Sequence, residues 1–131
     1  MELPKCQSNL PYPPIKPECK NPMYAHAMLS NIGSANSEMT AISLYIYNRF
    51  VTAQKDDIAQ IFHKISVVEM HHLNIFGTLA VQLGADPRLW AQINRRMVYW
   101  TPQYNHYPTE LKPLLQNSLS GELRTIEKYK T

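Results

Sequence analysis

Cysteine is scarce in this 131-residue chain, which has 2 copies, Cys6 and Cys19. They do not form a C-x-x-C pair, which excludes a four-cysteine iron or zinc site within one chain. We expect free thiols, as in a reducing compartment, and a single disulfide between the two stays open as the alternative.

The sequence also lacks long hydrophobic runs and clustered charge. No stretch approaches the ~18 consecutive apolar residues of a membrane span, and no apolar segment typical of a secretory signal appears in the proline-rich start. We therefore expect a cytoplasmic protein without a membrane partner. The 13 basic residues are offset by 10 acidic ones, and the only adjacent basic pair is Arg95 and Arg96. A nucleic-acid partner is not expected, because such proteins gather basic residues on one face.

Proline is concentrated at the start of the chain, where residues 1–22 hold prolines at positions 4, 11, 13, 14, 17 and 22. Proline fixes φ and lacks an amide donor, so this segment is predicted to be an extended arm. Residues 23–131 are long enough for one domain with its own core.

Apolar residues in this domain recur every three or four positions, and strand-like alternation is absent. The sequence therefore predicts an all-α helical bundle with three long helices, over residues 23–54, 57–83 and 109–131. Gly84 suits the end of the second helix. Residues 85–108, rich in aromatic side chains, are predicted to be a crossover connection that opens with a short helix over residues 86–94.

The strongest local signal is the pair Glu69 and His72, which lie three residues apart on the apolar face of the second predicted helix. A carboxylate and an imidazole that are buried together need a compensating partner, and a metal ion serves both. Glu38 lies on the apolar face of the first predicted helix, at a similar height across an antiparallel hairpin. The alternative without metal is a buried Glu–His pair and an exposed Glu38.

An internal repeat relates the first and third predicted helices. Residues 34–42 reappear as residues 118–126, and each copy has a glutamate followed seven residues later by a tyrosine. Glu122 is thereby the counterpart of Glu38, and Tyr129 is the counterpart of Tyr45. The two tyrosines either hydrogen-bond ligand carboxylates or fill the core.

These motifs resemble the ferritin-like superfamily, in particular its rubrerythrin-type and manganese-catalase-type proteins. The resemblance rests on residues 21–24, 37–42 and 68–72. It implies a dimetal centre of iron or manganese, in which Glu38 is a terminal ligand, Glu69 bridges both ions and His72 binds the first ion. Glu122 would be the terminal carboxylate of the second ion. The resemblance also implies peroxidase, catalase or ferroxidase-like chemistry with hydrogen peroxide or dioxygen.

The sequence departs from the pattern of this superfamily, which has a fourth helix with a second Glu-x-x-His. No such motif follows His72. Either the chain is a truncated piece, or a second chain completes the bundle in a homo-oligomer, or a reduced metal site forms. A helical scaffold or coat-type assembly protein with a degenerate or absent metal site is the alternative function.

The other histidines are not predicted to be ligands. His71 points about 100° away from its neighbour on a helix, and His63 lies off the face that carries the predicted ligands. His26 and His106 have no partner that the sequence suggests.

Overall fold

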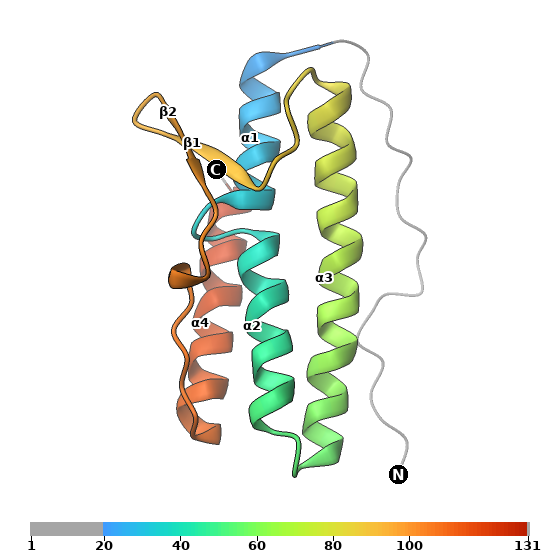
Figure 1. Cartoon of the computed structure of the whole chain (residues 1–131), viewed down its shortest axis with the longest axis vertical. Coiled ribbons are helices and arrows are strands. Elements are labelled where there is room, and N and C mark those ends of the chain that lie inside the picture. The colour runs from blue at the N-terminus through green and yellow to red at the C-terminus, as the bar shows by residue number, and fades with distance from the viewer. Residues whose placement is uncertain (1–19, 131) are drawn as a thin grey trace.

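The helices pack as an antiparallel bundle (Figure 1). The computed structural model describes residues 20–130, so Cys6, Cys19 and nearly all of the expected arm lie outside the described residues. Helices α1 (Pro22–Gly33) and α2 (Glu38–Val51) follow one another, α3 (Asp56–Gln82) returns beside them, and α4 (Leu111–Lys130) lies against α2. This arrangement confirms the prediction of an all-α bundle.

The first predicted helix is interrupted, so the prediction of one continuous helix over residues 23–54 is wrong at residues 34–37. Serine and asparagine in this stretch offer the backbone local hydrogen bonds that compete with the helix. The Ser34 hydroxyl donates to Ser30 O at 2.6 Å, and the Ser37 hydroxyl caps α2 by accepting from Thr40 N at 3.4 Å. Glu38 is consequently the first residue of α2.

Residues 90–99 form a β-hairpin, which corrects the prediction of a short helix over residues 86–94. Strand β1 (Trp90–Ile93) pairs antiparallel with β2 (Arg96–Tyr99). The two turn residues, Asn94 and Arg95, have φ of 52° and 66°, as in the tight turns whose twist suits a hairpin. Strands of 4 residues are too short to show a clear alternation of apolar and polar residues in the sequence.

A glycine cap ends α3. Gly84 has a φ of 99°, in the left-handed region that favours glycine. Its N–H donates to Val81 O at 3.0 Å, and the N–H of Ala85 donates to Ala80 O at 2.8 Å, which together form a Schellman motif. The cap turns the chain away from α3 and towards the hairpin.

The segment between the hairpin and α4 docks on α2. It contains the short 3-10 helix η1 (Pro102–Tyr104). Trp100 Nε1 donates to Thr40 Oγ1 at 3.0 Å, and Asn105 Nδ2 donates to Ser43 Oγ at 2.7 Å. This segment runs down the length of α2, so α4 begins at the far end of the bundle and runs antiparallel to α2 (Figure 1).

Two buried clusters hold the helices together. One joins α1 and α3 through Leu29, Ile32 and Ala80, and the other joins α2, α3 and α4 through Tyr45, Phe62 and Leu114.

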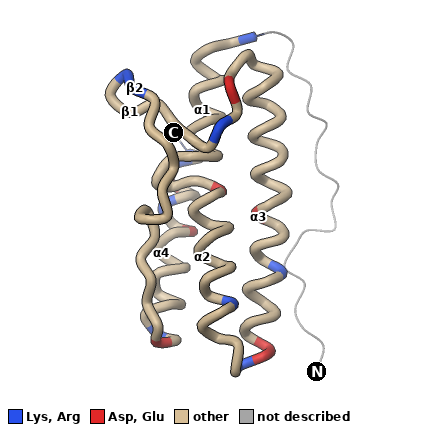
Figure 2. Tube along the Cα trace, in the orientation of Figure 1, with Lys and Arg blue, Asp and Glu red and all other residues tan. Residues whose placement is uncertain are grey.

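Lys and Arg are spread over the described elements instead of being gathered on one of them (Figure 2). None of the described helices has a stretch long and apolar enough to cross a membrane.

Candidate metal centre

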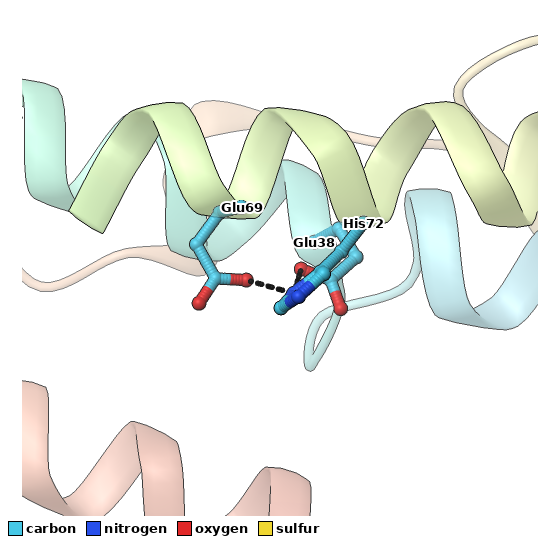
Figure 3. A group of neighbouring side chains, drawn as sticks. All are labelled: Glu38, Glu69 and His72. Carbon is cyan, nitrogen blue, oxygen red and sulfur yellow. Dashed lines mark hydrogen bonds and ion pairs between the residues drawn. The ribbon is translucent and has the colours of Figure 1, made fainter. Parts of the chain in front are cut away.

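Glu38, Glu69 and His72 come together where α2 faces α3 (Figure 3). One ligand-type atom from each residue lies within 4.8 Å of the other two. Glu69 and His72 share one face of α3 because they are three residues apart, and Glu38 reaches them from the first turn of α2. The fold therefore brings together three residues that the sequence singled out by spacing.

Glu38 is the most buried of the three, with 4% of its surface exposed. Tyr129 on α4 donates to Glu38 Oε1 at 3.0 Å. The other oxygen, Oε2, is buried without a hydrogen-bond partner among the described residues, and it lies 3.7 Å from His72 Nδ1. Burial raises the pKa of Glu38, but the neighbouring side chains of His72, Glu69 and Tyr129 together outweigh burial and lower that pKa below its usual value. A buried anionic oxygen without a donor is a position that a cation would satisfy.

Glu69 and His72 form an ion pair, with 3.3 Å between Oε2 and Nδ1. Burial, helped by the nearby Glu38 carboxylate, raises the pKa of Glu69 to about 7. The neighbouring carboxylates of Glu38 and Glu69 raise the pKa of His72 to about 10. In the metal-free protein, the imidazolium therefore supplies positive charge to the carboxylates. The His72 side chain is 37% exposed, which leaves the cluster accessible from solvent.

A cavity of about 140 Å³ lies beside this cluster and includes the fourth predicted ligand, Glu122 on α4. Glu122 stands outside the compact group of three, and its Oε1 accepts a hydrogen bond from Tyr45 at 2.5 Å. The remaining lining residues are Ser37, Ala41, Thr125 and Tyr129. All four predicted ligands thus face one cavity, and three of them lie close together.

The two tyrosines of the repeat bind the two repeat glutamates in a crossed arrangement. Tyr45 of α2 donates to Glu122 of α4, and Tyr129 of α4 donates to Glu38 of α2. Burial, together with the neighbouring carboxylates, raises the pKa of both phenols above the usual value of 10. Both phenols therefore stay protonated at neutral pH and act as donors to these carboxylates.

The other histidines lie apart from the cluster. His63 Nδ1 is 3.1 Å from Arg49 Nη1 on α2, while His26 and His106 line two other cavities. His71 is exposed on α3. None of these residues belongs to the group of possible ligands found in the described part of the chain.

The sequence did not point to Thr125 and Lys128 of α4, which bind the segment between α1 and α2. Thr125 Oγ1 donates to Asn36 Oδ1, 89 positions earlier, and Lys128 Nζ donates to Asn36 O, 92 positions earlier. Contacts over such separations leave no periodic signal along the chain. The repeat that aligns the two glutamates was the nearest hint that α4 pairs with this region.

The set of donor atoms suits a hard, redox-active cation. Three carboxylates and an imidazole offer oxygen and nitrogen ligands, whereas thiolates would favour softer ions. Glutamates from separate helices around a Glu-x-x-His motif also form the dimetal sites of carboxylate helical bundles. The residues present therefore fit the binding of manganese or iron.

Comparison with known proteins identifies one family. The family model described as manganese containing catalase matches residues 5–97 of the chain. The match covers more than half of the sequence, includes Glu38, Glu69 and His72, and ends before Glu122. Searches among curated proteins and among solved structures each found no match.

Proposed function

The chain belongs to the manganese-containing catalase family, and from this premise we propose that it binds a pair of manganese ions and converts hydrogen peroxide to water and dioxygen in the cytoplasm. Membership of the family makes this a ferritin-like dimetal carboxylate protein. The metal, the reaction and the ligand roles go beyond that membership and form the proposal.

The buried Oε2 atom of Glu38 is the observation that carries the proposal. It lacks a hydrogen-bond partner among the described residues, although its side chain is almost fully buried. His72 Nδ1 lies 3.7 Å away, so the oxygen has an ion-pair neighbour but no hydrogen-bond donor, and a buried acceptor without a donor typically costs on the order of 1–3 kcal/mol. A cation that binds Glu38 Oε2, Glu69 and His72 would remove this cost and replace the His72 proton.

The resemblance to the family implies the ligand roles, and the lining of one cavity by all four residues supports them. Glu38 and His72 would hold the first ion, Glu122 would hold the second, and Glu69 would be shared between them. When bound, manganese supplies the redox couple that takes electrons from one peroxide molecule and gives them to another. The net reaction turns two peroxide molecules into two waters and one dioxygen, so no other reductant is required.

The surrounding residues orient the ligands and control access. Tyr45 and Tyr129 hold Glu122 and Glu38 in place before any ion arrives, which is how residues behind a metal ligand normally act. The exposed edge of His72 keeps the cavity open to solvent. A small uncharged molecule such as hydrogen peroxide can therefore reach the cavity without displacing any part of the bundle.

We also propose that the protein works as a homo-oligomer. Large apolar side chains on α4 are about half exposed or more, namely Leu115, Leu119, Leu123 and Ile126, at 48–61%. An apolar stripe of this kind on a soluble protein typically marks an interface. The oligomeric mass of the purified protein, measured by light scattering, tests this proposal, and a strictly monomeric protein would contradict it.

Metal content and peroxide turnover test the proposed function together. The protein is loaded separately with Mn²⁺ and Fe²⁺, metal per chain is measured by elemental mass spectrometry, and dioxygen release from peroxide is followed with an electrode. We expect tight manganese binding and turnover, both lost in Glu69→Gln. The matched control is Glu127→Gln, since Glu127 is 74% exposed and pairs only at the surface with Lys130. A wild-type protein with no bound metal and no turnover would contradict the proposal and favour a helical scaffold.

A further inference from the structure

Lys128 on α4 forms hydrogen bonds on both sides of the break between α1 and α2, which is the non-helical segment of residues 34–37. Its Nζ donates to Asn36 O at 2.8 Å, to Ser30 O at 3.0 Å and to Ser34 Oγ at 3.3 Å. An ammonium group has three donors and can satisfy three such acceptors. Ser30 O belongs to the last turn of α1, where the negative end of the helix dipole attracts a cation. The Lys128 ammonium therefore ties both sides of the break together.

The same end of α4 makes further contacts with this region. Thr125 Oγ1 donates to Asn36 Oδ1 at 2.9 Å, within the break. Tyr129, the residue after Lys128, donates to Glu38 Oε1. The last turns of α4 thus hold both the break and the carboxylate that follows it.

The geometry of the break decides where the Glu38 carboxylate lies. Glu38 is the first residue of α2, so its position depends on how α2 starts after α1. Residues 34–36 are only partly buried or exposed, so side-chain packing alone does not fix this segment. Its hydrogen bonds with α4 supply the missing constraint. Lys128 makes two of them, to Ser34 Oγ and Asn36 O, and its third bond reaches Ser30 O at the end of α1.

We propose that Lys128 is a positioning residue for Glu38, and that by fixing the break it sets the manganese affinity of the site. The metal in this inference rests on the proposed function. The hydrogen bonds that carry the inference do not, so the effect of Lys128 on the break can be tested in the metal-free protein.

The test compares Lys128→Met, which keeps the aliphatic stem but removes the donors, with Lys130→Met. Lys130 is the matched control because its side chain is 66% exposed and pairs with Glu127 at the surface. The dissociation constant for Mn²⁺ is measured from the electron paramagnetic resonance of the free ion. Amide hydrogen exchange of the metal-free protein is measured by mass spectrometry on peptides that cover residues 30–41.

We expect Lys128→Met to weaken Mn²⁺ binding by about 10- to 100-fold, the usual effect of losing a residue that orients a ligand, and to speed exchange across the break. Lys130→Met should leave both quantities unchanged, and Lys128→Arg should restore part of the affinity. Faster exchange with unchanged affinity would overturn the positioning role and leave a structural one. Unchanged exchange and affinity would overturn the inference entirely.

Failure of the proposed function gives a different result. If the wild-type protein binds no Mn²⁺, both the metal site and the positioning role of Lys128 are contradicted. Faster amide exchange in Lys128→Met would still show that Lys128 stabilises the break. If Lys128→Met does not fold, Thr125→Val tests the attachment of α4 to the same segment, because it removes the hydrogen bond of the Thr125 hydroxyl to Asn36 Oδ1 together with its bond to Gly121 O within α4. An unchanged affinity and exchange in that variant would overturn the inference.

Discussion

Tyr129 on α4 donates a hydrogen bond to Glu38 Oε1 on α2, at 3.0 Å, across 91 positions of the chain. Tyr45 and Glu122 make the reciprocal contact in the opposite direction. Glutamate and tyrosine are seven residues apart in each helix, so two antiparallel helices with this spacing can satisfy both pairs at once. The internal repeat therefore gives α2 and α4 two complementary glutamate–tyrosine contacts. Both glutamates line the cavity of the candidate metal site.

Removing the phenol hydroxyl of Tyr129 should weaken metal binding more than it weakens the fold. In Tyr129→Phe, Glu38 loses the donor that orients its carboxylate, and we expect manganese affinity to fall about 10- to 100-fold. Tyr47→Phe is the control, because Tyr47 lies on α2, the helix of Glu38, but donates to the backbone carbonyls of Tyr107 and Pro108. Titration of both variants with Mn²⁺ checks the prediction, and an equal effect in both would contradict it.

Metal affinity should rise with pH between about 6 and 9. Ligands must be deprotonated to bind a metal, and in the metal-free site the pKa of Glu69 is about 7 and that of His72 is about 10. Below pH 7 both groups hold protons that a metal must displace, whereas between pH 7 and 10 mainly His72 does. The affinity should therefore rise more steeply below pH 7 than above it.

Calorimetry in two buffers with different ionisation enthalpies measures the protons released on binding. We expect about one proton per metal site near pH 8 and a larger number near pH 6. Binding without proton release at pH 8 would show that His72 is already neutral in the metal-free protein. It would also rule out the ion pair between His72 and Glu69 as the resting state of the site.

Alanine substitutions at Gly33 and Gly77 should change the free energy of unfolding in opposite directions. A Cβ at Gly33 would lie 2.5 Å from Trp90 N of the hairpin backbone, while a Cβ at Gly77 meets nothing within 4 Å. Gly33→Ala should reduce the free energy of unfolding by about 1–3 kcal/mol, since the hairpin must shift. Gly77→Ala, inside α3, should increase it by up to about 1 kcal/mol, because alanine favours the helix. Chemical denaturation of the metal-free variants decides between these signs, and a stabilising Gly33→Ala would mean that the hairpin does not pack there.

Leu114 should be the main anchor of α4. It is fully buried against Tyr45 and Phe62, and the only other buried residue of α4 is Ser118. Leu114→Ala should cost about 2–5 kcal/mol of stability, as is typical for buried leucines, and should expose α4 to limited proteolysis. Gln116→Ala, at an exposed position of the same helix outside the apolar stripe, should change stability by no more than about 0.5 kcal/mol. Equal protease sensitivity of the two variants would argue against this role for Leu114.

The sequence alone determined the helical class and most of the candidate site. Apolar spacing of three or four is a local property, so it indicated the stretches that became α3 and α4. The Glu-x-x-His motif placed two ligands on one face of α3, because residues three apart on a helix always share a face. Glu38 could be added because a short connection near residue 55 forces α2 and α3 to be antiparallel neighbours.

Tertiary structure decided what local spacing leaves undetermined. The break at residues 34–37 and the hairpin at residues 90–99 arise where helix, turn and short strand differ little in local energy, so contacts such as that of Gly33 with Trp90 select the outcome. The hydrogen bonds of Tyr45 and Tyr129 with the repeat glutamates, and those of Lys128 with the break, depend on how α4 docks against α2. No periodicity encodes a contact between residues about ninety positions apart, because only the folded chain brings them within hydrogen-bonding distance.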